Sequence, residues 1–232
     1  MKNEFTVIGF DADDTLWINQ PNYDEAEKNY YRFLSDYCPP QKISEKLYKI
    51  ELQNLELYGY GAKSFTLSLI ETALRISKNK VPQNIIEKII KLGKELINRP
   101  VILLEGVQGV LENLFENGQK LIIATKGDLL DQKRKLKNSN IGKYFHHIEI
   151  MSNKNESDYQ NLLSHLDIKP MDFLMIGNSL KSDILPVLKI SGYGIHIPYH
   201  TTWQHEQSLK SVTHDNFIEI THISELTNIF KT

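Results

Sequence analysis

Several features that mark other classes of protein are scarce in this sequence. Cys38 is the only cysteine among 232 residues, so no disulfide can form within the chain, and a reducing, cytoplasmic location is expected. The first residues show no signal-peptide pattern, and no apolar run is long enough to span a bilayer. The formal net charge of -2 argues against a general nucleic-acid binder or a basic membrane-surface protein. We therefore expect a soluble protein with neither a membrane nor a nucleic acid as partner.

Residues 5–16 join a short apolar run to three carboxylates. The run from Phe5 to Phe10 suits a strand that is buried on both faces of a parallel sheet, and Asp11, Asp13 and Asp14 follow it at once. Loops at the carboxyl ends of strands form the ligand crevice of an open α/β sheet, so we expect Asp11 and Asp13 to stand at its floor and to point the same way. Carboxylates this close repel each other unless a cation or a shared proton intervenes, and their hard oxygens favour magnesium.

The hydrophobic periodicity divides the chain into two parts. Apolar residues recur every three or four positions between the first strand and Pro100, which predicts four helices, at residues 23–37, 43–58, 64–77 and 84–98. After Pro100, short apolar runs alternate with amphipathic helices, as in βαβ units. Strands are predicted at residues 120–124, 147–151, 173–176, 194–197 and 217–220, and helices at 107–117, 129–137, 157–166, 182–190 and 223–230.

This pattern predicts the fold class. We expect an α/β fold, a Rossmann-like parallel sheet with helices on both faces, together with an all-helical domain. The α/β core domain would comprise residues 1–16 and 101–232, and the helical domain residues 17–100.

Polar residues follow the predicted strands where each strand ends. Thr125 and Lys126 follow one strand, Lys154 follows the next, and Asn178 and Asp183 follow a third. If these strands are parallel neighbours of the first, their polar side chains converge with Asp11 and Asp13 at one edge of the sheet. Carboxylate and amide oxygens suit a metal, whereas a hydroxyl and an ammonium suit an anion, so the set forms a plausible phosphate site.

These motifs, in this order, carry a resemblance. The sequence D-A-D-D-T at residues 11–15, Thr125, Lys154, and G-N-S at 177–179 through Asp183 resemble the haloacid dehalogenase (HAD) superfamily of hydrolases over about two thirds of the chain. The resemblance implies that Asp11 attacks phosphorus to form an aspartyl-phosphate, while Asp13 protonates the leaving oxygen and later deprotonates the attacking water. Thr125 and Lys154 would hold the phosphoryl oxygens. Magnesium would be held by Asp11, the backbone carbonyl of Asp13, and the loop from Asn178 to Asp183.

Two positions refine this expectation. Dehalogenating members lack an acid at the position of Asp13, because halide leaves without a proton, so Asp13 favours phosphate esters. Phosphatases of this type usually have an aspartate where this chain has Asn178, and an amide oxygen brings no negative charge to a metal. The resemblance also makes residues 17–100 a cap that closes over the site and selects the leaving group. Cap side chains able to face the substrate are Tyr23, Tyr58, Tyr60 and Lys63, although packing is the commoner role of such tyrosines.

Several of these residues also allow a purely structural interpretation. Asp11, Asp13 and Thr125 are also residue types that cap helices. Lys154 lies in a polar loop where a solvated lysine is the ordinary expectation, and Lys169 is a rival for its role. Lys126 and Lys181 are expected to face solvent, although either is able to touch an anion, and we include Lys126 among the substrate-binding candidates.

Two further clusters favour structural interpretations. The basic run at residues 133–137 lies on a predicted amphipathic helix, where a solvated polar face is the commoner explanation. His196, His200 and His205 match no tight zinc motif, so we expect their loop to flank the site or to pack on the core.

The leading hypothesis is a magnesium-dependent phosphatase that acts on a small phosphorylated metabolite, as a monomer or a homodimer. A phosphomutase would use the same residues and pass the phosphoryl group to a sugar. A third hypothesis is a catalytically silent binding protein, which the amide of Asn178 suggests because it stands where phosphatases have an aspartate. A response-regulator receiver also clusters Asp, Thr and Lys, but it is about half this length and has no helical insert.

Overall fold

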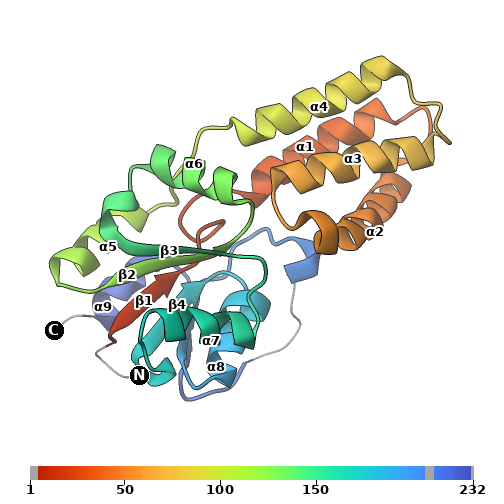
Figure 1. Cartoon of the computed structure of the whole chain (residues 1–232). Coiled ribbons are helices and arrows are strands. Elements are labelled where there is room, and N and C mark those ends of the chain that lie inside the picture. Colours follow the sequence, from red (N-terminus) through yellow and green to blue (C-terminus); the bar gives the residue numbers. More distant parts are fainter. Residues whose placement is uncertain (1–4, 207–211, 231–232) are drawn as a thin grey trace. The chain divides into compact units, whose positions relative to one another are not determined.

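The parallel sheet stands at the centre of the larger part of the protein (Figure 1). The computed structural model describes residues 5–206 and 212–230. Within these residues six strands, all parallel to their neighbours, form one sheet in the order β3-β2-β1-β4-β5-β6. The strands are β1 (Val7–Phe10), β2 (Leu121–Lys126), β3 (Phe145–Met151), β4 (Phe173–Gly177), β5 (Tyr193–His196) and β6 (Phe217–Glu219). The first strand of the chain therefore lies in the middle, between β2 and β4.

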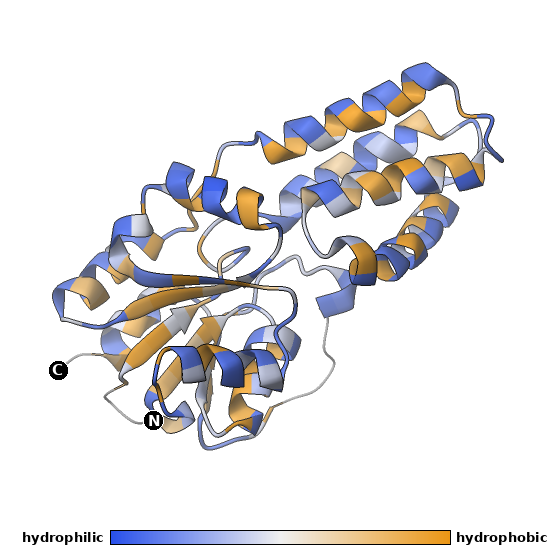
Figure 2. Cartoon of the chain, viewed as in Figure 1, coloured by the Kyte–Doolittle hydropathy of each residue, from blue (hydrophilic) through white to orange (hydrophobic). Residues whose placement is uncertain are grey.

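Helices cover both faces of this sheet, as predicted. They are α5 (Val107–Glu116), α6 (Leu129–Ser139), α7 (Glu156–His165), α8 (Leu185–Lys189) and α9 (Leu226–Ile229). Successive strand side chains point to opposite faces, so Ile8 packs with α5 and α9 through Val110 and Leu226. Val7 packs on the other face with α7 and α8, through Leu162 and Val187. Burial on both faces explains why β1, β2 and β4 read as continuous apolar runs (Figure 2).

The helical part of the chain has its own hydrophobic core. It contains α1 (Gln20–Phe33), α2 (Pro40–Tyr58), α3 (Ala62–Ile76) and α4 (Gln83–Ile97), each with one apolar face (Figure 2). Tyr30, Leu47, Leu69 and Ile89 from the four helices are almost completely buried in one cluster. Helices α3 and α4 pack closely, because a Cβ on Gly93 would lie 2.1 Å from Thr66 Oγ1.

The chain forms two compact units. One comprises residues 1–20, 101–126 and 135–232, and the other residues 21–100 and 127–134. The predicted fold class, a Rossmann-like α/β core with an all-helical cap, is confirmed, whereas the assignment of residues 17–100 as a functional cap domain stays a prediction. In the part of the chain that the structure describes, every helix is too short or too polar to cross a membrane.

Most predicted elements have their observed counterparts within a few residues. One helix differs in kind, because the predicted helix at residues 182–190 is a π-helical turn (Leu180–Ile184) followed by the short α8. Pro186 lies in the first turn of α8, where its missing N–H costs no helical hydrogen bond. The last predicted helix likewise begins as a 3₁₀ turn (Ile223–Glu225) before α9.

Candidate active site

Asp11 lies at the carboxyl end of the central strand. The chain has just left β1 there, and the Asp11 N–H donates to the Ile176 carbonyl of neighbouring β4 at 2.9 Å. Its carboxylate accepts from Lys154 Nζ at 2.5 Å and from Thr15 Oγ1 at 3.1 Å. Burial raises the pKa of Asp11 to about 7, against the lowering effect of the Lys154 ammonium.

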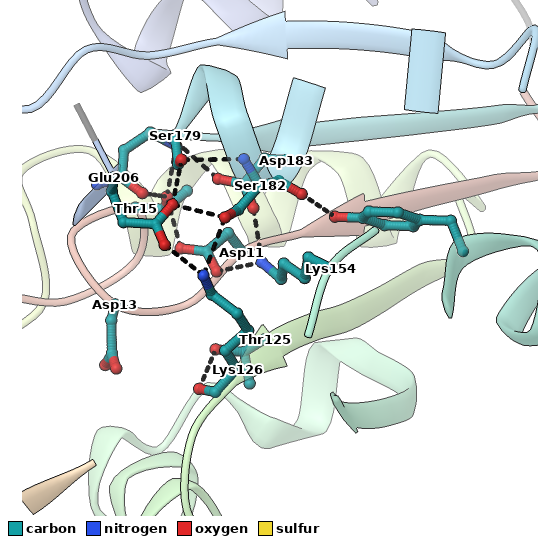
Figure 3. A network of polar contacts seen from close by, with 12 residues as sticks. Asp11, Asp13, Thr15, Thr125, Lys126, Lys154, Ser179, Ser182, Asp183 and Glu206 are labelled. Carbon is teal, nitrogen blue, oxygen red and sulfur yellow. Dashed lines mark hydrogen bonds and ion pairs between the residues drawn. The ribbon is translucent and has the colours of Figure 1, made fainter. Parts of the chain in front are cut away.

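Lys154 is a buried cation shared by two carboxylates (Figure 3). Its Nζ is 2.5 Å from Asp11 Oδ1 and 2.6 Å from Asp183 Oδ1, and 1% of its side chain is exposed. Burial alone would lower the pKa of Lys154, but the two carboxylates raise it above its ordinary value. The next residue, Asn155, forms a capping box with Asp158 at the start of α7, which fixes the backbone beside Lys154. Lys169, the rival in the sequence, is exposed.

Asp183 folds back against the end of β4. Its Oδ2 accepts from the Ser179 N–H at 2.9 Å, and its Oδ1 accepts from Lys154. This arrangement requires glycine at position 177, because a Cβ there would lie 2.3 Å from Asp183 Oδ2. The backbone between Gly177 and Asp183 is also fixed by the buried Tyr159, whose hydroxyl donates to the Ser182 carbonyl at 3.1 Å.

Asn178 is tied to the first motif and to a histidine. Its N–H donates to Thr15 Oγ1 at 3.1 Å, and Thr15 in turn contacts Asp11. Its backbone carbonyl lies 3.0 Å from His196 Nε2, and His196 Nδ1 lies 2.8 Å from Glu219 Oε2. We expected the histidine loop to flank the site or to pack on the core, and the buried His196 at its start flanks the site through its contact with the Asn178 backbone.

Asp13 does not point the same way as Asp11. Its Oδ1 accepts from Trp17 Nε1 at 2.6 Å and from Lys135 Nζ at 2.9 Å, and Figure 3 shows its carboxylate directed away from Asp11. The strand ends at Phe10, so the two-residue periodicity of strand side chains no longer applies at Asp13.

Asp14 performs the capping role that we considered for its neighbours. It has a φ of 62°, and its carboxylate accepts from the N–H groups of Asn19 and Gln20 at the start of α1. Burial raises the pKa of Asp14 to about 7.

Thr125 and Lys126 end β2 beside this cluster (Figure 3). Thr125 is buried, and its hydroxyl donates to the Lys126 carbonyl at 3.2 Å. The expectation that Lys126 faces solvent is wrong, because 15% of its side chain is exposed and its ammonium contacts Ser182 Oγ at 2.9 Å and the Glu206 carboxylate. Sequence reasoning missed Glu206. No local pattern points to it, since its contacts span 24 to 80 residues.

The remaining candidates have other contacts. Lys181 is exposed, as expected, and its Nζ donates to the His205 carbonyl at 2.9 Å. In the helical unit, the Tyr23 ring packs edge-on against Phe65, and Lys63 forms an ion pair with Asp128 at 2.8 Å. These contacts give Tyr23 a packing role, which we held to be the commoner one.

Comparison with known proteins decides the family. Residues 5–187 match the family described as haloacid dehalogenase-like hydrolase. The chain belongs to this family. The resemblance expected from the motifs of this HAD hydrolase is therefore confirmed, and the structural neighbours share its fold.

One neighbour is considerably more similar than the other two described. A haloacid dehalogenase-like family hydrolase from Xanthomonas campestris is 33% identical, with a TM-score of 0.86, over 95% of this chain and 88% of that chain. The HAD-hydrolase YfnB from Bacillus subtilis, bound to magnesium, is 16% identical, with a TM-score of 0.65, over 99% and 100% of the two chains. A 2-haloacid dehalogenase from Pseudomonas syringae pv. Tomato is 16% identical, with a TM-score of 0.64, over 97% of each chain. No curated protein matches the sequence.

The oxygen atoms around Asp11 fit magnesium better than a transition metal. Among residues 5–206 and 212–230, no three His, Cys, Asp or Glu side chains are grouped to hold a metal. Magnesium needs few protein ligands, because it keeps several waters and takes one or two carboxylates together with substrate phosphate. Asp11 and Asn178 bring a carboxylate and an amide oxygen to the same cluster through Thr15, and the Asp11 oxygens accept from Lys154 and Thr15. Asp183 is engaged by Lys154 and by the Ser179 N–H, so it would join them only by exchanging one of these bonds.

Proposed function

We propose that this HAD hydrolase is a magnesium-dependent phosphatase that acts on a small phosphorylated metabolite through an aspartyl-phosphate on Asp11. One observation carries the proposal, namely the buried Asp11 carboxylate held 2.5 Å from the Lys154 ammonium at the end of the central strand. A phosphomonoester dianion repels a carboxylate, so nucleophilic attack needs a cation at the site of reaction. Lys154 provides that cation from within the protein.

The first chemical step is displacement at phosphorus. An Asp11 carboxylate oxygen forms a bond to phosphorus while the bond between phosphorus and the ester oxygen breaks. The leaving oxygen takes a proton from Asp13 and departs as an alcohol, and Asp13 is left as a carboxylate. Thr125 Oγ1 and the Lys154 ammonium are the groups we assign to the phosphoryl oxygens.

The second step returns Asp11 to its starting state. Water attacks phosphorus, Asp13 accepts a proton from that water, and the bond from phosphorus to Asp11 breaks to release phosphate. For this role Asp13 must exchange its hydrogen bonds to Trp17 and Lys135 for contacts with the leaving group and water.

Magnesium, when bound by Asp11, Asn178 and the Asp13 carbonyl, would neutralise charge on the phosphoryl group and orient it. The magnesium-bound neighbour from Bacillus subtilis supports this assignment by likeness of fold alone. The chain's own cations share the task, because Lys154 remains charged between Asp11 and Asp183.

Asp13 separates phosphate ester chemistry from dehalogenation. Halide leaves without a proton, so a dehalogenase has no use for an acid at this position, whereas an alkoxide leaving group requires one. The presence of Asp13 therefore favours a phosphate ester as substrate, although the structural neighbours include a 2-haloacid dehalogenase.

The test is a substrate panel that covers both chemistries. Phosphate release from para-nitrophenyl phosphate and small phosphate esters, and halide release from 2-chloropropionate, would be measured with magnesium and with a chelator. Wild type and Asp11→Asn would be compared after circular dichroism shows that both are folded. We expect magnesium-dependent phosphate release in wild type alone. Halide release, or no turnover of any ester, would overturn the proposal.

A further inference from the structure

A carboxylate from outside the family motifs lies in the cluster around Asp11. Glu206 lies in the short 3₁₀ turn Gln204–Glu206, which comes after β5 in the chain, and 14% of its side chain is exposed. One of its oxygens accepts from the Lys126 ammonium, and the other accepts from Ser179 Oγ at 2.7 Å and from Ser182 Oγ at 2.5 Å (Figure 3). Burial alone would raise the pKa of Glu206, but Lys126 and the two hydroxyls hold it at about 2. Glu206 is thus a buried anion with three donors.

These donors belong to the two segments that form the proposed site. Lys126 directly follows Thr125, which we assign to the phosphoryl group. Ser179 and Ser182 lie between Asn178 and Asp183, and the Ser179 hydroxyl also accepts from the Ser182 N–H at 3.1 Å. The ammonium of Lys126 also donates to Ser182, so carboxylate, ammonium and hydroxyls form one closed network. A displacement of Glu206 would therefore move side chains at the carboxyl ends of both β2 and β4.

The charge of Glu206 matters as well as its shape. Lys126 is largely buried, and a buried ammonium is strongly unfavourable without a compensating charge. The carboxylate neutralises this ammonium and directs it into the network, whereas a neutral residue of the same size would keep only the weaker hydrogen bonds. Because a phosphate dianion is recognised by positioned cations, the location of Lys126 bears directly on substrate affinity.

We propose that Glu206 is a positioning residue, which acts through Lys126 and the Ser179–Ser182 segment to set the affinity of the site for the phosphoryl group. This inference rests on the proposed function for its kinetic consequences. Its effect on the binding of inorganic phosphate does not require turnover.

The experiment is a double-mutant cycle between Glu206 and Lys126. Glu206→Gln keeps the shape and removes the charge, Glu206→Asp keeps the charge on a shorter side chain, and Lys126→Met removes the ammonium. Glu149→Gln is the matched control, because Glu149 is a partly exposed carboxylate on β3 that pairs with His147. For each variant, KM and kcat for para-nitrophenyl phosphate, the Kd for inorganic phosphate in magnesium, and Tm would be measured.

We expect Glu206→Gln to raise both KM and the phosphate Kd by about tenfold, the order expected for losing a charge-assisted hydrogen bond, with a smaller effect on kcat. Glu206→Asp should recover part of the loss, and Glu149→Gln should behave as wild type. The double variant Glu206→Gln/Lys126→Met should lose less phosphate affinity than the sum of the losses in the two single variants, because Glu206 acts in part through Lys126. If Glu206→Gln does not fold, Glu206→Asp takes its place in the cycle.

Two results would overturn the proposal. A change in Tm with an unchanged phosphate Kd would make Glu206 a purely structural contact, and additive losses in the double variant would show that it does not act through Lys126. Absence of ester turnover in wild type would count against the phosphatase proposal, and the phosphate-binding cycle would still decide the role of Glu206.

Discussion

The buried cation between Asp11 and Asp183 makes a quantitative prediction. Lys154→Met replaces the ammonium with an apolar side chain of similar length. The two buried carboxylates then lose the cation that they share. Breaking a buried ion pair by removing one partner costs about 3–5 kcal/mol, since the remaining charge is left uncompensated. We therefore expect the free energy of unfolding to fall by about 3–5 kcal/mol at neutral pH.

The matched control is a second lysine with a comparable ion pair at the surface. Lys189 contacts Glu156 at 2.5 Å, but 66% and 47% of the two side chains are exposed. Solvent screens such a pair, so Lys189→Met should change the free energy of unfolding by about 0–1 kcal/mol.

The loss in Lys154→Met should also depend on pH. Without the ammonium, the pKa of the Asp11 carboxyl rises further above its unfolded value, so the folded variant holds a proton that the unfolded chain has released. Stability then falls as pH rises, and the difference from wild type should be larger at pH 8 than at pH 5. A chelator is included so that no metal replaces the lost cation.

Urea unfolding followed by tryptophan fluorescence suits this comparison. The only two tryptophans, Trp17 and Trp203, belong to the same compact unit as Lys154, so the signal reports on the unit that contains the change. If Lys154→Met loses no more stability than Lys189→Met, the buried triad does not stabilise this unit and the reasoning is refuted.

Three further predictions concern the acid, the helical unit and a close helix contact. Asp13→Asn should slow hydrolysis of alkyl phosphates by about 10²–10⁴-fold and that of para-nitrophenyl phosphate by less, because nitrophenolate leaves without a proton; equal losses in kcat would contradict the assignment of Asp13 as the acid. Burial raises the pKa of Glu51 in α2 to about 8 from 4.5, so the folded chain keeps a proton that the unfolded chain loses, and stability falls as pH rises through that window. Glu51→Gln should therefore stabilise the protein by about 1–3 kcal/mol at pH 8 and little at pH 5. If Tm depends on pH in the variant as it does in wild type, the buried Glu51 carboxyl does not cause the loss of stability. Gly93→Ala should lower the free energy of unfolding by about 1–3 kcal/mol, since its Cβ would lie 2.1 Å from Thr66 Oγ1. Gly109→Ala in α5, whose Cβ would have no neighbouring atom within 4 Å, should raise the free energy of unfolding by up to about 1 kcal/mol. Equal changes in the urea midpoint of the two variants would refute the packing argument.

The fold was predictable because local patterns report burial directly. Strands β1, β2 and β4 are buried on both faces, so their apolar runs identified them, and the apolar faces of α1 to α4 gave the helical periodicity. The convergence of Asp11, Thr125 and Asn178 was predictable for the same reason, because they lie at the carboxyl ends of strands that proved to be parallel neighbours. The carboxyl ends of parallel neighbours meet at one edge of the sheet.

What the sequence could not provide lies in side-chain direction and in distant contacts. Asp13 turns toward Trp17 and Lys135 because the chain has left the strand, and no periodicity governs its orientation there. Glu206 and His196 reach the site through contacts between segments far apart in the chain, and neither lies in a family motif. Such residues become visible only when the sheet brings their segments together.

An aspartyl-phosphate on Asp11 can be detected directly by mass spectrometry. Wild-type protein with magnesium would be mixed with para-nitrophenyl phosphate, quenched in acid at early times, and digested for mass spectrometry, with Asp11→Asn treated in parallel. We expect a transient mass gain of one phosphoryl group on the peptide that contains Asp11, and no such gain in the variant. Phosphate release at an undiminished rate by Asp11→Asn, with no phosphoryl group on that peptide in wild type, would contradict this expectation.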